Sequence, residues 1–190
     1  MSVMTIRIRK IKISNSPGFS FVELMTVIAI IGILSAVALP SILGNMPEKR
    51  LKSAARNLYA DLQKARLLAV KENRSIRVRF DNSTSPGFYY FDDDESGNPG
   101  FEQWNAGEFR KNFVDYGAVD YGTASATKDW NSSTLPPATP TDLITFSKTG
   151  TANNASVYLQ SQNNQEICYA VTVTNFGAVK IRRFSGSSWE

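Results

Sequence analysis

The stretch that decides the fold is GFSFVELMTVIAIIGILSAVALP, which runs from Gly18 to Pro40 and carries its only charge at Glu23. No further charge follows before Glu48, so the uncharged run exceeds the roughly 20 residues that a helix needs to cross a bilayer. A core helix of a soluble domain would show a polar face, and this run shows none. The sequence therefore predicts a membrane-inserted helix with one carboxylate near its start.

The composition excludes the commonest catalytic and metal-binding designs. The chain has 190 residues, no histidine and a single cysteine, Cys168. Histidine-based triads, Cys/His zinc clusters and disulfides within the chain are therefore impossible. We expect a protein that is not an enzyme and that needs no cofactor and no metal. Cys168 lies in an apolar run, which predicts a buried structural thiol rather than a reactive one.

The positive net charge is concentrated in the first residues of the chain. The net charge is +4, and Arg7, Arg9, Lys10 and Lys12 supply four positive charges with no acid before residue 19. The remainder has 21 − 4 = 17 basic groups against 17 acidic groups. A mature chain without this leader is close to neutral, so no domain-wide positive field would attract nucleic acid.

Two interpretations of the N-terminus are compatible with this pattern. Basic residues, an apolar run and the Ala36–Ala38 tripeptide also fit a secretory signal peptide with an A-x-A cleavage site. A carboxylate such as Glu23 inside the apolar run costs a few kcal/mol, however, and serves nothing in a segment that is discarded. The position of Glu23 therefore favours a different kind of leader.

The heptapeptide GFSFVEL, residues 18–24, resembles the processing site of type IV prepilins and type II secretion pseudopilins. In that family, a dedicated prepilin peptidase cuts a basic leader after the glycine, on the cytoplasmic face, and the new N-terminus is methylated. The resemblance implies cleavage between Gly18 and Phe19, so that N-methyl-Phe19 starts the mature chain.

The same resemblance gives Glu23 a role in assembly. An unpaired carboxylate in hydrocarbon is expensive, so it needs a partner of opposite charge. Cleavage creates an amine on Phe19, about one helical turn from Glu23. The resemblance implies that the Phe19 amine of one subunit meets Glu23 of its neighbour in a helical filament whose core is formed by the apolar segments.

An amphipathic pattern follows the apolar run. Small and branched apolar residues recur at spacings of four and three, with Lys and Arg between them, which is the period of a helix with one buried face. We expect the helix to continue to about Asn73. The apolar positions are Leu51, Ala55, Leu58, Leu62, Ala65 and Ala69.

The pattern then changes to the period of two that is typical of half-buried strands. SIRVRF, from residue 75, alternates strictly, and GFYYF follows it after a Pro86-Gly87 turn. The later strand candidates are LITF, SVYLQ, ICYAVTV and AVKIRRF, and residues 123–142 form a Thr-, Ser- and Pro-rich loop candidate.

Two stretches of the C-terminal half, ITFSKTGTANNASVYLQ and YAVTVTNFGAVKIRRF, are similar to the tail of the GspH/FimT group of minor pseudopilins and pilins. The expected fold is α+β: a long N-terminal helix whose second half packs on an antiparallel β-sheet or β-sandwich, as in type IV pilins. The expected organisation is a leader at 1–18, a helix at 19–73 and a periplasmic β domain at 74–190. Within the helix, residues 19–45 cross the membrane or form the filament core, and 48–73 are amphipathic.

The resemblance implies a structural subunit, a minor pseudopilin or pilin assembled near a filament tip. Its expected partners are other pilins or pseudopilins, the prepilin peptidase with its methyltransferase activity, and the bacterial inner membrane, which it crosses once with its C-terminal domain in the periplasm. Either a type II secretion pseudopilus or a type IV pilus is compatible with the sequence.

A DNA-binding pilin that serves DNA uptake is the alternative function, because some FimT-type pilins bind DNA. The candidate contacts are Lys180, Arg182 and Arg183, and alternation places Lys180 and Arg182 on one strand face, spaced to follow phosphates. Against it, many relatives carry Arg where this chain has Ala178.

A partial calcium motif lies at Asp92–Gly97, with oxygen ligands at alternate positions before a glycine. The twelfth position is Gln103 rather than the bidentate glutamate that the motif requires, and Pro99 interrupts the spacing. A solvated hairpin loop is the favoured interpretation.

Overall fold

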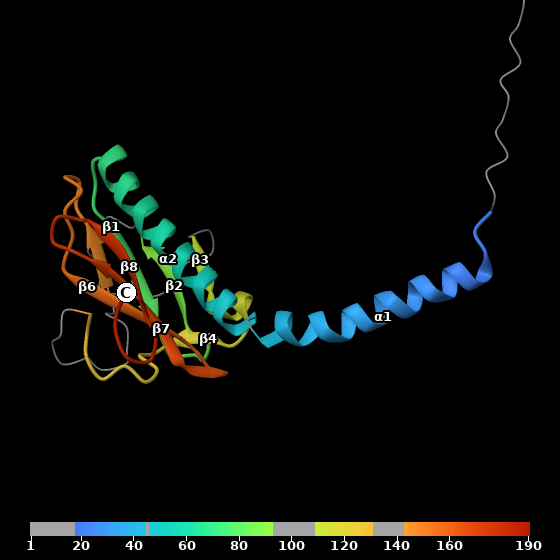
Figure 1. Ribbon diagram of the computed structural model, residues 1–190. Coiled ribbons are helices and arrows are strands. Elements are labelled where there is room, and N and C mark those ends of the chain that lie inside the picture. Colours follow the sequence, from blue (N-terminus) through green and yellow to red (C-terminus); the bar gives the residue numbers. More distant parts are fainter. Residues whose placement is uncertain (1–17, 45, 93–108, 131–142) are drawn as a thin grey trace, which may run out of the picture. The chain divides into compact units, whose positions relative to one another are not determined.

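The computed structural model describes residues 18–44, 46–92, 109–130 and 143–190. These residues form two compact units, divided between Leu43 and Gly44. Figure 1 shows the N-terminal unit as a single helix and the C-terminal unit as a helix packed on β-strands.

The N-terminal unit is the helix α1, Phe21–Gly44. Its segment Phe21–Leu39 is long and apolar enough to cross a membrane. Every large apolar side chain of that segment is exposed, so no apolar face of α1 is covered within its own unit. A helix of this length and composition is suited to surroundings of lipid or of other apolar helices.

The helix α2, Met46–Lys71, opens the C-terminal unit and buries the predicted apolar stripe. Alanines at three stripe positions bring the helix backbone close to the strands beneath it, because Ala adds little side-chain volume. The helix ends at Lys71, and Asn73 takes a positive φ of 52°, a conformation that Asn tolerates better than most residues. The buried residues of α2 are Leu51, Ala54, Ala55, Leu58, Leu62, Ala65 and Ala69.

The strands form two antiparallel sheets of four strands each. The first has the order β3-β2-β1-β5, and the second has the order β4-β6-β7-β8. The strands of the first sheet are β1 Ile76–Asp81, β2 Phe88–Asp92, β3 Arg110–Asn112 and β5 Leu143–Phe146. Those of the second sheet are β4 Val119–Tyr121, β6 Ala155–Ser161, β7 Asn164–Val173 and β8 Val179–Phe184.

The main core lies between α2 and the two sheets. Helix α2 contacts strands of both sheets, above all β7, β1 and β8, and Figure 1 shows it lying along them. Alternate residues of the longer central strands point into this core, as Val157 and Leu159 do from β6 and as Val171 does from β7. The period-two prediction for these segments is therefore confirmed.

A smaller apolar cluster covers the opposite face of the second sheet. Cys168 of β7 and Phe184 of β8 pack there with Ala126 from the loop after β4, and Trp189 packs against them. The second sheet is thus packed against α2 on one face and partly covered by loop and C-terminal residues on the other.

Some elements lie outside the sequence-based expectations. The three-residue strands β3 and β4 and the 3₁₀ helix η1, Phe113–Tyr116, were not predicted. The continuous helix expected from residue 19 to residue 73 is described as α1 and α2, and Asn45 lies outside the described residues. Of the predicted loop at 123–142, only residues 123–130 are described.

Candidate functional site

The predicted cleavage site lies just before α1. Gly18, Phe19 and Ser20 precede the helix without regular structure, and the Phe19 side chain is 82% exposed. No heavy atom lies within 4 Å of the position that a Cβ on Gly18 would take. The Gly18–Phe19 peptide bond is therefore unobstructed by the rest of the described chain.

Glu23 lies in the first turn of α1, where a negative charge interacts favourably with the helix dipole. The Thr26 hydroxyl donates a 2.9 Å hydrogen bond to the Glu23 backbone carbonyl, and this bond leaves the carboxylate untouched. Within the described part of the chain no cation forms an ion pair with Glu23. Its counter-charge has to come from elsewhere.

The three basic residues of the C-terminal strand fall on two different faces of the second sheet. In the β7–β8 ladder, Lys180 lies opposite Thr172 and Arg182 lies opposite Ala170, so both side chains are on the face away from α2. This confirms that Lys180 and Arg182 share a face. Arg183 lies on the other face, towards α2.

Arg183 takes part in an ion pair within the C-terminal unit. Its Nη2 donates a 2.8 Å hydrogen bond to Glu48 Oε1, and its Nη1 lies 3.9 Å from Glu190 Oε2. On the opposite face, the Arg182 guanidinium lies 5.2 Å from the ring centre of Trp130, within cation–π distance. Of the three predicted DNA contacts, Lys180 is exposed and the two arginines are half-buried, so they do not form one open basic patch.

The first residue of the partial calcium motif is already neutralised by arginines. Asp92 is 3% exposed, with Arg77 Nη2 at 3.1 Å from Oδ1 and Arg79 Nε at 2.8 Å from Oδ2. Both carboxylate oxygens are therefore engaged. The rest of the motif, residues 93–97, lies outside the described residues, and no other group of acidic side chains that the structure describes could hold a metal ion.

The predicted structural role of Cys168 agrees with its surroundings. The side chain is fully buried between Phe184 and Ala126. Burial raises the pKa of the Cys168 thiol to about 12, so the thiol is neutral at physiological pH. A neutral, inaccessible thiol is a poor nucleophile.

Comparison with protein-family models finds two matches that together cover most of the chain. Residues 13–39 match the model described as "Prokaryotic N-terminal methylation motif", which includes Gly18, Phe19 and Glu23. Residues 54–177 match the model described as "Type II transport protein GspH". None of the curated proteins compared with the chain matches it.

Comparison with solved structures finds the Pseudomonas aeruginosa (strain PAO1) type IV minor pilin FimU. The chain superposes on one crystal form of that protein with a TM-score of 0.50 and 17% sequence identity, over 70% of this chain and 89% of the other. A second crystal form gives a TM-score of 0.45 and 16% identity, over 69% of this chain and 91% of the other. The first superposition confirms the predicted pilin-like α+β fold: an apolar N-terminal helix, then a helix packed on antiparallel sheets.

Proposed function

We propose that this chain, which belongs to the GspH family of type II pseudopilins, is a minor subunit assembled near the tip of a type II secretion pseudopilus. Membership of that family makes the protein a structural subunit rather than an enzyme. The family match favours type II secretion over a type IV pilus as the host machine. Its partners in this role are the other pseudopilins of the filament.

Processing precedes assembly in this proposal. The prepilin peptidase removes residues 1–18 and methylates Phe19, which leaves residues 19–73 as the helical spine and 74–190 as the periplasmic β domain. Before assembly, α1 anchors the chain in the inner membrane as a single span, which agrees with its length and apolar composition.

The observation that carries the proposal is the isolation of Glu23 in an uncovered apolar helix. Every large apolar side chain between Phe21 and Leu39 is exposed, and Glu23 has no ion-pair partner within the described part of the chain. A filament supplies both missing components at once. Neighbouring copies of the apolar helix cover its surface, and the Phe19 amine of an adjacent subunit neutralises the carboxylate.

DNA binding remains the alternative function, and the structure offers it little support. Arg183 is engaged by Glu48 and Arg182 is stacked on Trp130, which leaves Lys180 as the one exposed cation of the three. Three free cations on one face would be a stronger argument for phosphate contact.

The test is to replace Glu23 and to separate insertion from assembly. Glu23→Ala should still insert in the membrane, because the apolar segment loses a charge. Incorporation into the filament should fall, since the Phe19 amine of the adjacent subunit is buried without a counter-ion. A buried charge that loses its partner costs about 3–5 kcal/mol, which corresponds to a reduction of roughly two to three orders of magnitude or more. In-membrane crosslinking to other pseudopilins measures this incorporation.

Glu23→Gln is the matched variant. It keeps the size and a hydrogen-bond acceptor, so it should assemble better than Glu23→Ala and less well than the wild type. If processed Glu23→Ala co-assembled at wild-type levels, the carboxylate would not be the assembly contact and the proposal would fail.

A further inference from the structure

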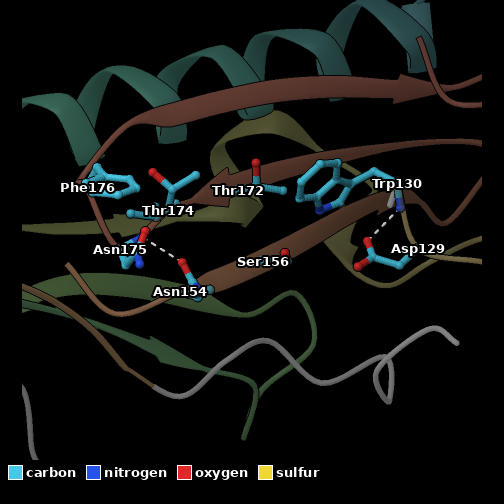
Figure 2. A pocket seen from close by; sticks show the side chains of 10 residues that line it. Asp129, Trp130, Asn154, Ser156, Thr172, Thr174, Asn175 and Phe176 are labelled. Carbon is cyan, nitrogen blue, oxygen red and sulfur yellow. Dashed lines mark hydrogen bonds between the residues drawn. The ribbon is translucent and has the colours of Figure 1, made fainter. Parts of the chain in front are cut away.

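A pocket of about 530 Å³ lies on the second sheet, on the part of its surface that the smaller apolar cluster leaves uncovered. That volume is within the range of small-molecule sites. It is lined by the ends of β6 and β7, by the β7–β8 turn and by the loop before Trp130, and Figure 2 shows these side chains. The lining residues are Asp129, Trp130, Asn154, Ala155, Ser156, Thr172, Val173, Thr174, Asn175 and Phe176.

The polar side chains of the pocket are mostly uncharged. Ser156 and Thr172 are opposite each other in the β6–β7 ladder, and Thr174, just after the end of β7, also lines the pocket. Asn154 Oδ1 accepts a 2.6 Å hydrogen bond from the Asn175 backbone N–H, which fixes the amide at the end of the row. Hydroxyls and amides can each donate and accept hydrogen bonds, so this surface suits a ligand that carries many hydroxyl or amide groups.

Asp129 is the one charged residue of the lining, and two donors of the protein already engage its Oδ1. The Trp130 backbone N–H donates to it at 2.6 Å, and the Tyr158 hydroxyl donates to it as well. Burial, and next the hydrogen bond to Asp129, raise the pKa of Tyr158, which keeps the phenol protonated as a donor. One carboxylate oxygen of Asp129 is therefore already used by hydrogen bonds within the protein.

Aromatic side chains stand at the two ends of the row of polar residues, with Trp130 at one end and Phe176 at the other (Figure 2). The Arg182 guanidinium stacks on the Trp130 ring but does not line the pocket. The pocket therefore contacts a part of the indole that the guanidinium leaves open. The Phe176 side chain is 77% exposed and lies on the turn between β7 and β8. Flat aromatic faces carry partial negative charge and attract C–H groups that carry partial positive charge.

Two buried polar atoms of the pocket residues lack a hydrogen-bond partner in the described part of the chain. These atoms are Thr172 Oγ1 and Trp130 Nε1, and Thr172 is only 2% exposed. An unsatisfied buried polar group costs free energy and is rare in native proteins. The isosteric side chain of Val would avoid this cost, so within the described part of the chain the Thr172 hydroxyl has no hydrogen-bonding role.

We propose that this pocket binds a saccharide. A pyranose ring combines an apolar C–H face, which stacks on an aromatic ring, with hydroxyls that donate and accept hydrogen bonds. These two properties match the Trp130 and Phe176 walls and the Ser, Thr and Asn surface between them. The lining offers no free cation for an anionic ligand, and the β6–β7 ladder that forms its floor is already paired, so an added peptide strand would find no open ladder there.

This inference is independent of filament assembly, because none of the pocket residues belongs to α1. It would give the periplasmic domain a contact with glycan. The glycan has two possible chemical sources, the N-acetylated amino sugars of the cell-wall polymer and plain glucosides.

The test is ligand titration of the full-length protein in an amine-oxide detergent, since maltoside and glucoside detergents carry the chemical group under test. The probes are N,N′-diacetylchitobiose and cellobiose, with inorganic phosphate as the charged control. Tryptophan fluorescence and ligand-observed NMR should both show saturable binding of one disaccharide, with half-saturation at or below about 1 mM. The disaccharide that binds more tightly identifies the source.

Two variants and one control make the result specific. Thr172→Val removes only the unsatisfied hydroxyl and should weaken binding about tenfold while the thermal midpoint stays the same or rises. Trp130→Ala should abolish binding. Tyr116→Phe, an aromatic change in η1, outside the pocket and without contact to its lining, should leave binding unchanged.

The proposal is overturned if neither disaccharide binds saturably. It is also overturned if phosphate binds in their place, if a polar peptide binds more tightly than both sugars, or if folded Thr172→Val and Trp130→Ala bind as the wild type does. Failure of the assembly test on Glu23 would not change any of these results.

Discussion

Arg183, near the end of β8, donates a 2.8 Å hydrogen bond to Glu48, in the first turn of α2, across 135 positions of the sequence. The carboxylate lies where the helix dipole favours negative charge, and the guanidinium reaches it from the face of the sheet that packs on α2. The ion pair thereby joins the end of β8 to the first turn of α2, which packs on the same face of the sheet. The sequence grouped Arg183 with two other cations as a nucleic-acid contact, whereas the fold uses it internally.

This ion pair should contribute modestly to stability. Both side chains are about one-third exposed, at 33% and 37%, so solvent screens their attraction. In a double-mutant cycle with Glu48→Ala and Arg183→Ala, we expect a coupling free energy of about 0.5–1 kcal/mol that decreases with salt. Urea unfolding of the full chain, followed by near-ultraviolet circular dichroism, measures it. Strictly additive single and double variants would show that the contact contributes nothing.

Gly177, in the β7–β8 turn, should tolerate no side chain. Its φ is +72°, and a Cβ there would collide with the Gly150 carbonyl oxygen and lie 3.0 Å from Arg66 Nε. That oxygen accepts a 3.0 Å hydrogen bond from the same Arg66 nitrogen, so neither group can move without losing it. We expect Gly177→Ala to lower the free energy of unfolding by about 3 kcal/mol, from the left-handed backbone and overpacking together.

Gly186 provides the control for the backbone part of this effect. Its φ is +89°, but the nearest atom to an added Cβ is at 3.8 Å, which is ordinary contact. Gly186→Ala should therefore cost only about 1 kcal/mol. If the two variants lost equal stability in the same urea titration, the collision with Gly150 would not be the cause.

Cys168 should make the protein less stable at high pH. Burial raises the pKa of its thiol from 9.0 to about 12, so the folded state favours the neutral form. The stabilisation is complete below pH 9 and is lost as the pH rises towards 12, because the unfolded thiol ionises first. Between pH 8 and pH 10 the wild type should lose about 1 kcal/mol that Cys168→Ala does not lose.

Urea titrations of both proteins at the two pH values test this. A thiol reagent provides a second readout, because it should label Cys168 only after unfolding. Labelling of the folded protein at the rate of a free thiol would contradict the burial seen here.

The sequence predicted best those elements whose periodicity is long and regular. The apolar stripe of α2 and the alternation along β1 each follow from side chains within one element, and the structure buries them as expected. In β8 only the two end residues, Val179 and Phe184, are buried, and Ile181 is exposed. The register also confirms that Lys180 and Arg182 share a face, because alternation depends only on strand geometry.

Contacts between distant segments could not be predicted in this way. The strands β3 and β4 have three residues each, which is too short for a period to be recognised. Glu48 and Trp130 were not singled out, because their partners Arg183 and Arg182 are brought to them only by the fold. A tryptophan within a Ser- and Thr-rich loop was the one local signal for the pocket.

DNA should bind this protein only weakly. With Arg183 engaged by Glu48, Lys180 and Arg182 are the two of the three predicted contacts that could reach phosphates. If both do, replacing them by Ala lowers the slope of log affinity against log salt by about 1.8, whereas Arg183→Ala leaves it unchanged. Mobility-shift assays on duplex DNA at several salt concentrations measure these slopes. Tight binding by the wild type at physiological salt would instead make DNA uptake the preferred function.

The mature protein should begin at N-methyl-Phe19. The bond between Gly18 and Phe19 is unobstructed by the described chain, and it lies five residues before Glu23, within the matched methylation motif. Mass spectrometry of protein from the native membrane should find this N-terminus.

Gly18→Ala should slow cleavage only partly, since it adds one methyl group at an open position, whereas Gly18→Leu should stop it and leave the basic leader attached. An uncut chain has no amine on Phe19, so Gly18→Leu should insert in the membrane but fail to crosslink to other pseudopilins. That failure should match the one expected of Glu23→Ala, because each variant removes one partner of the same ion pair. A mature chain that begins at Leu39 would show signal-peptidase cleavage after Ala38, and the protein would then be secreted rather than assembled.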